Sequence, residues 1–160
     1  AAMFEDAFIF NQDLSKWDVS AVTDMSVLFS SAPAFNQDLS KWDVSAVTNM
    51  AAMFILASAF NQDLSKWDVS AVTNMRSMFN GASAFKRELC GVAWVNSKAD
   101  KEDMFFSAPG SISSKKICTT AGPGDNGGED LFPLFLFCVR AHNVYGVSFV
   151  QHLNLGCRRV

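Results

Sequence analysis

Cysteine, histidine and clustered basic residues are scarce along most of this chain. Its 160 residues include 4 Cys and 2 His, and neither type occurs before Cys90. The same stretch has no glycine-rich loop of the kind that cradles phosphate, so the usual sources of a nucleophile, a base or a phosphate site are missing. The net charge of −3 leaves no basic stripe to neutralise a nucleic acid. We therefore expect a non-catalytic protein that needs no cofactor and does not bind nucleic acid.

Long apolar runs are also missing. The segment LFPLFLFCV at residues 131–139 has nine residues and is interrupted by Pro133. A membrane-spanning helix needs about 20 apolar residues, so we expect no transmembrane segment. The start, AAMF at residues 1–4, lacks the basic flank and apolar run of a targeting signal. Because this start falls inside a repeat, we expect that further residues precede it.

A repeat of 25 residues dominates the sequence. The segment FNQDLSKWDVSAVTDM at residues 10–25 recurs at 35–50 and 60–75, with one Asp replaced by Asn in both later copies. Residues 1–9 match the tail of a preceding copy, and residues 85–109 keep the pattern loosely, as terminal repeats commonly do. The sequence thus predicts a partial unit at 1–9, three full units at 10–34, 35–59 and 60–84, and a degenerate terminal unit at 85–109.

The last part of the chain, residues 110–160, has a different composition. Residues 1–110 contain 8 Lys+Arg and 13 Asp+Glu, whereas residues 111–160 contain 5 and 3. The segment GPGDNGGED at 122–130 has the composition of a flexible linker. We therefore predict a linker and an unassigned C-terminal segment over 110–160.

Within one unit, the pattern predicts a strand, a turn and a short helix. Residues 16–19 alternate between polar and apolar, as a half-buried strand does. Met25, Leu28 and Phe29 then lie at i, i+3 and i+4, which is one apolar stripe of a helix. A single unit cannot bury its large side chains alone, so stacked units must share a core. The predicted fold class is α/β: a right-handed leucine-rich-repeat-like solenoid with one short parallel strand and one short helix per coil, followed by an irregular C-terminal segment.

Stacking would place each polar residue above its own copies, about 4.8 Å apart. Two such columns consist of Asn11, Asn36 and Asn61 and of Asp13, Asp38 and Asp63. The asparagine column is able to form hydrogen bonds along the stack. The aspartate column would accept backbone amides in a turn, or bind calcium, which would relieve the repulsion between carboxylates. The turn interpretation is favoured, because glycine-rich ion-binding turns are absent.

The outward side of the predicted strands carries alternating charges. These columns either neutralise one another or form a binding surface, since solenoids generally use this face for partners. The candidate binding residues are Ser15, Lys16, Asp18, Ser40, Lys41, Asp43, Ser65, Lys66 and Asp68.

The cysteines allow three interpretations. In a secreted protein they would pair, for example as Cys90–Cys118, although sequence alone does not give the connectivity. The weak candidates for a zinc site are Cys138, His142, His152 and Cys157, since tetrahedral zinc accepts two thiolates and two imidazoles. Their short spacing fits no recognisable zinc finger, so no metal site is assigned. Free thiols are the third possibility.

The pattern FNQDLSxWDVSxVTNMxxMFxxAxxF resembles the repeat of BspA-like leucine-rich-repeat surface proteins. The resemblance covers residues 1–89 closely and 85–110 more loosely, and it does not extend to 118–160. It implies a secreted or surface-anchored protein that acts in adhesion or ligand binding. We therefore expect an extracellular or cell-surface protein that binds a protein or glycan through its repeat face. The alternatives are a structural spacer, or a small metal-binding or enzymatic module in 118–160 that the repeats carry.

Overall fold

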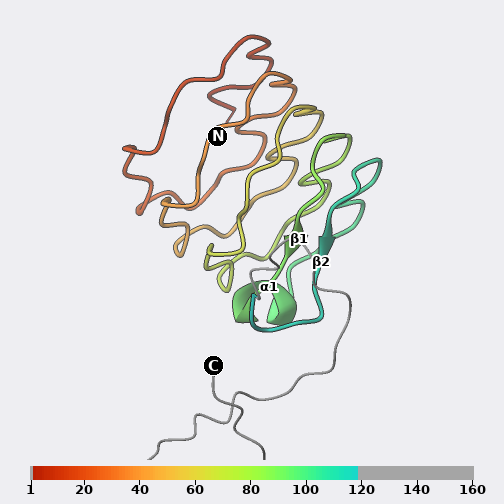
Figure 1. The fold of residues 1–160 in the computed structure, drawn as a ribbon. Helices are drawn as coiled ribbons and strands as arrows, with labels where there is room; N and C mark the ends of the chain where they lie inside the picture. The colour runs from red at the N-terminus through yellow and green to blue at the C-terminus, as the bar shows by residue number, and fades with distance from the viewer. Residues whose placement is uncertain (1, 119–160) are drawn as a thin grey trace, which may run out of the picture. The chain divides into compact units, whose positions relative to one another are not determined.

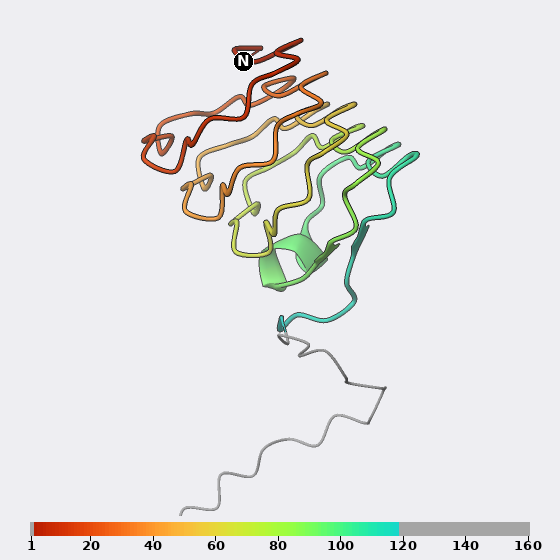
Figure 2. The same cartoon turned by 45° about the horizontal axis from the view of Figure 1, so that its top comes forward.

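The computed structural model describes residues 2–118, and in this range the repeat units lie side by side (Figures 1 and 2). Three regular elements occur in the described residues: β1 (Glu88–Leu89), α1 (Val92–Asn96) and β2 (Ser111–Ile112). The two strands pair in parallel, with Glu88 opposite Ser111 and Leu89 opposite Ile112. β2 lies beyond residue 109, where we predicted the terminal unit to end, and it continues the pattern of contacts between units.

Parallel bridges between corresponding residues join the units. Asp24 pairs with Asn49, Asn49 with Asn74, and Asn74 with Asp100. The amide of Thr48 donates to the carbonyl oxygen of Thr23 over 2.8 Å, and the next unit repeats this bond. Backbone groups separated by about one repeat therefore satisfy each other, which is the requirement for burying them.

The segment predicted as a short helix forms turns instead in all three full units. In the first of them, the amides of Phe29 and Ser31 donate to the carbonyls of Met53 and Ile55 in the next unit, over 2.9 and 2.8 Å. An α-helix would need these amides for its own i−4 bonds. Val27 also has a φ of 51°, in the left-handed region that a right-handed helix cannot contain. Bonding to the neighbouring unit thus replaces helix formation.

The strand predicted at residues 16–19 is likewise absent, although its alternation of burial is present. In the second unit Trp42 and Val44 are 4% and 2% exposed, whereas Lys41 and Asp43 lie on the surface. The side chains therefore alternate between core and solvent, while the bridges between units form further along the chain, at Asp24 and its counterparts.

The core consists of columns of identical side chains. Two columns of phenylalanine run through it with ring centroids 5.4–6.0 Å apart, and Phe54 of the second unit lies 4.0 Å from Phe60, the first residue of the third. The predicted apolar stripe also faces inward, since Met50, Met53 and Phe54 are fully buried. One column contains Phe4, Phe29, Phe54, Phe79 and Phe105, and the other Phe10, Phe35, Phe60 and Phe85.

The tryptophan column is buried in every unit that has a unit before it to pack against. Trp42, Trp67 and Trp94 are 4%, 2% and 1% exposed, and each indole N–H donates to the carbonyl of a leucine in the preceding unit. Trp17, in the first full unit, is 46% exposed. Trp42, Trp67 and Trp94 therefore belong to one core, whereas Trp17, at the end of the described stack, does not.

Candidate functional site

The nine candidate binding residues form a periodic surface, here called the repeat face. The lysines and aspartates of all three units are exposed, and the serines are half-buried. Each serine amide donates to the carboxylate two residues earlier: Ser15 to Asp13 and Ser40 to Asp38, both over 2.8 Å. The third unit repeats the bond from Ser65 over 2.9 Å. The prediction that the aspartate column accepts backbone amides in a turn is confirmed.

The aspartates of the repeat face itself also accept hydrogen bonds from the serines that lie two residues after them. Asp18 accepts both the amide and the hydroxyl of Ser20, over 3.0 and 2.7 Å, and Asp43 makes the same two bonds to Ser45. Hydrogen bonds from the serine hydroxyls, and then from the serine amides, lower the pKa of these carboxyls. The negative charges of the face are therefore fixed in position and ionised at neutral pH.

The lysines lie between aspartates of successive units. Hydrogen bonds from Ser40 are the main cause of the lowered pKa of Asp38, and the charges of Lys41 and Lys66 contribute to it. Within residues 2–118, however, the close ion pairs all involve Arg76, which contacts Asp100 and Glu102. The ammonium groups of the face are thus close enough to carboxylates to lower their pKa, yet form no close pair with them.

A polar groove of about 250 Å³ crosses the repeat face between the second and third units. It brings the predicted Ser40 and Lys66 together with four residues that we did not assign to the site. Those four are Asp38, Gln62, Asp63 and Arg87.

Arg87 is the residue in this groove that the sequence reasoning missed. It occupies the place that Gln62 has one unit earlier, and its Nε donates to the carbonyl of Asn61 over 2.8 Å, as Gln62 Nε2 does to that of Asn36. The 25-residue period alone would have revealed it, because Lys86 and Arg87 follow Asn61 and Gln62 in register.

The asparagine column links the units along the same side. The amide of Asn36 donates to Asn11 Oδ1 and that of Asn61 to Asn36 Oδ1, both over 2.9 Å. The amide of Lys86 continues the series to Asn61 Oδ1 over 3.1 Å. The predicted hydrogen bonding along the stack is confirmed, and it gives the repeat face a fixed spacing.

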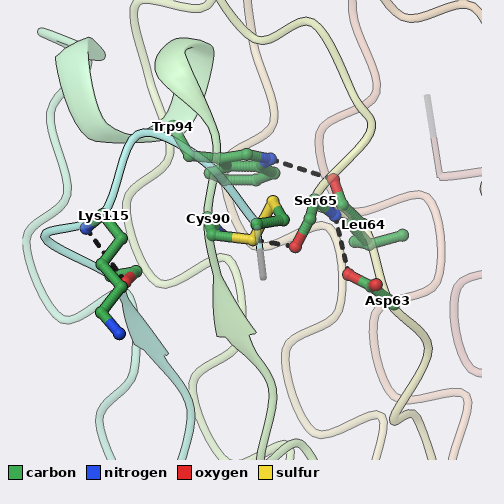
Figure 3. The surroundings of a disulfide bond; sticks show 8 residues. Asp63, Leu64, Ser65, Cys90, Trp94 and Lys115 are labelled. Atoms are coloured by element: carbon green, nitrogen blue, oxygen red, sulfur yellow. Dashed lines mark hydrogen bonds between the residues drawn. A yellow bond between two sulfur atoms is a disulfide. The ribbon is translucent and has the colours of Figure 1, made fainter. Parts of the chain in front are cut away.

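The disulfide given as an example from the sequence is present (Figure 3). Cys90 and Cys118 are bonded, with their Cα atoms 5.3 Å apart. Cys90 occupies the position of Ser65 in the preceding unit, and its amide donates to Ser65 Oγ over 3.3 Å. Trp94, from α1, donates its indole N–H to the carbonyl of Leu64 over 2.9 Å beside it. The disulfide therefore fastens the terminal unit next to the tryptophan column.

Metal binding has little support in the described residues. The weak zinc candidates Cys138, His142, His152 and Cys157 lie outside them. Between residues 2 and 118 no three histidine, cysteine or carboxylate side chains are grouped to hold an ion. The carboxylates proposed for the calcium alternative are engaged by serine amides.

None of the helices described in residues 2–118 is long and apolar enough to cross a bilayer.

Comparison with known proteins gives a family for most of the chain. No curated protein and no solved structure matches it. One family model, described as "Mycoplasma protein of unknown function, DUF285", matches residues 1–117. These residues include the three full units, the terminal unit, the repeat face and Arg87. The chain therefore belongs to this family of Mycoplasma-type repeat proteins.

Proposed function

We propose that the protein is a non-catalytic surface or secreted protein that binds a protein or glycan ligand through its repeat face. We also propose that the array is a right-handed solenoid of the leucine-rich-repeat type, related to the BspA-like surface proteins whose repeat it resembles. A ligand would lie across the units and contact the lysines, aspartates and serines of successive coils.

The observation that carries this proposal is the column Lys16, Lys41 and Lys66. Each ammonium is exposed and has no close carboxylate partner among the described residues. The aspartates nearby are held by serines, so the charges of a ligand would meet a surface that is already ordered. Such preorganisation reduces the entropy lost on binding.

The repetition also favours binding over catalysis. Catalysis requires different groups to converge on one point, whereas the three full units present the same polar set at successive positions. A periodic surface of this kind suits an extended or repetitive partner, because each unit adds a similar contact and their effects multiply.

The test is a triple charge reversal, Lys16→Glu, Lys41→Glu and Lys66→Glu. Wild-type and variant proteins are applied to a printed glycan array and to a panel of immobilised extracellular-matrix proteins. The matched control is Lys86→Glu, Lys115→Glu and Lys116→Glu, which changes the net charge equally outside the nine candidate residues. Both variants should keep the circular dichroism spectrum of the wild type.

Binding that the first variant loses and the control keeps would support the proposal. Binding that both variants keep, or the absence of any bound probe for the wild type, would contradict it and favour a structural spacer. Binding retained by a protein shortened to residues 119–160 would place the activity in the C-terminal module instead.

A further inference from the structure

A second groove, of about 440 Å³, lies next to α1 and outside the repeat face. One wall is formed by residues 70–73 of the third unit, and the other by α1 and the residues after it, up to Lys98. Its volume is within the range of about 300–1,000 Å³ that is usual for small-molecule sites.

The groove lies where the terminal unit departs from the repeat. Trp94 follows Trp67 by 27 residues instead of 25, and α1 accommodates the two additional residues. Two residues after each preceding tryptophan is a buried valine, such as Val69, whereas the same place after Trp94 is taken by the exposed Asn96. Asn96 thus lines the groove at the position where the earlier units bury a valine in the core.

The polar groups of the groove can both donate and accept hydrogen bonds. Thr73 Oγ1 donates to the carbonyl of Thr48 over 3.1 Å, so its lone pairs remain to accept a bond. Ser97 Oγ accepts the amide of Ala99 over 3.3 Å, which leaves its own hydrogen to donate. Asn96 adds an exposed side-chain amide. These groups are suited to the hydroxyl groups of a ligand.

The groove has one ionic group and one apolar patch. Lys98 is the sole charged side chain of its lining and forms no close ion pair within residues 2–118. Val92, on α1, is 57% exposed and lies beside the polar groups. A complementary ligand would carry one negative charge, several hydroxyl groups and a face of C–H groups.

We propose that this groove binds an acidic sugar of the uronic acid class. Its carboxylate pairs with Lys98, its ring hydroxyls bond to Asn96, Ser97 and Thr73, and the C–H face of the ring lies on Val92. The site is independent of the repeat face, because its lining shares none of the nine candidate residues. Either proposal can therefore fail without the other.

The experiment is a titration of ¹⁵N-labelled protein of full length, followed by NMR chemical shifts. The probes are galacturonic acid and galactose, which differ only at C6, a carboxylate in the acid and a hydroxymethyl group in galactose. The acid should shift resonances from residues 70–73 and 92–98. Galactose should bind more weakly than the acid, by up to about fivefold, which is the effect expected of one partly exposed ion pair.

Three variants complete the test. Lys98→Gln should weaken binding of the acid about fivefold and leave the weaker binding of galactose unchanged, while Asn96→Ala should weaken both sugars. Lys116→Gln, the matched loss of an exposed lysine outside the groove, should have no effect. Equal affinity for the two sugars, an unchanged affinity in Lys98→Gln, or no shift in residues 70–73 and 92–98 up to the solubility of the acid would each overturn the proposal.

Discussion

The indole Nε1 of Trp42 donates a hydrogen bond to the carbonyl oxygen of Leu14 over 3.0 Å, although 28 residues separate the two. The bond is buried, and it recurs from Trp67 to Leu39 over 2.9 Å. Trp42 and Trp67 thus both fill the core and donate to a carbonyl of the preceding unit. This bond joins neighbouring units through a single side chain.

Trp42→Phe should destabilise the protein by about 1–3 kcal/mol, because the buried carbonyl of Leu14 loses one of its two donors, with the amide of Trp17 remaining, and because the ring is smaller. Urea unfolding followed by circular dichroism measures the change. Trp17→Phe is the matched control, since Trp17 is 46% exposed and its indole makes no hydrogen bond to residues 2–118. Equal losses in the two variants would contradict the role given to the bond.

Removal of one ring from a phenylalanine column should be more costly. Phe54 is fully buried and lies between Phe29 and Phe79, with ring centroids 5.6 and 5.5 Å away. Phe54→Ala should cost about 3–5 kcal/mol, through lost burial and the cavity that remains. Phe106→Ala, at a ring that is 63% exposed, should cost less than about 0.5 kcal/mol. A small effect at Phe54 would show that the rings do not form a continuous core.

The disulfide should stabilise the terminal unit. Cys90→Ser should lower the free energy of unfolding by about 2–4 kcal/mol, because the unfolded chain regains the freedom that the closed loop removes. Thermal unfolding should show the same decrease for Cys118→Ser and for the wild type with a dithiol reductant. If the reductant leaves the melting temperature unchanged, the bond does not stabilise this unit.

The serine-bound aspartates should make stability depend on acid pH. Hydrogen bonds from the hydroxyl and amide of Ser70 lower the pKa of Asp68 in the folded state. The folded protein therefore binds a proton less readily than the unfolded chain, whose aspartates have a pKa of about 3.9. The stabilisation is complete above that value and is lost as the pH falls through the folded pKa.

Urea midpoints at pH 6 and pH 3 measure this effect. The decrease between them should be smaller in Asp68→Asn than in the wild type. Asp103→Asn is the control, because the side chain of Asp103 makes no hydrogen bond to the described residues. If Asp68→Asn retains the whole decrease, the bonds from Ser70 do not contribute to it.

The repeat period was sufficient to predict which residues lie above one another. The asparagine and aspartate columns and the inward-facing Met50 and Phe54 follow from that period and from polarity. The backbone conformation within each unit did not follow from the period and polarity. The spacing of Met25 and Phe29 suits a helix, and the turns become favourable only because the next unit offers carbonyl acceptors.

In the terminal unit, too, the sequence revealed the register but not the local structure. A register delayed by two residues was visible at Trp94, but α1 and the groove beside it were not, since they depend on how the delay is accommodated. Arg87 was missed for a different reason. Its role depends on register, whereas the site residues were chosen among the exact repeats.

The most direct test of the stacked core is NMR of the four indole N–H groups. The buried indoles of Trp42, Trp67 and Trp94 should exchange slowly and show nuclear Overhauser effects to Leu14, Leu39 and Leu64 respectively, whereas Trp17 should exchange fast. Equal, fast exchange of all four indoles, with no such effects between units, would contradict the stacked core.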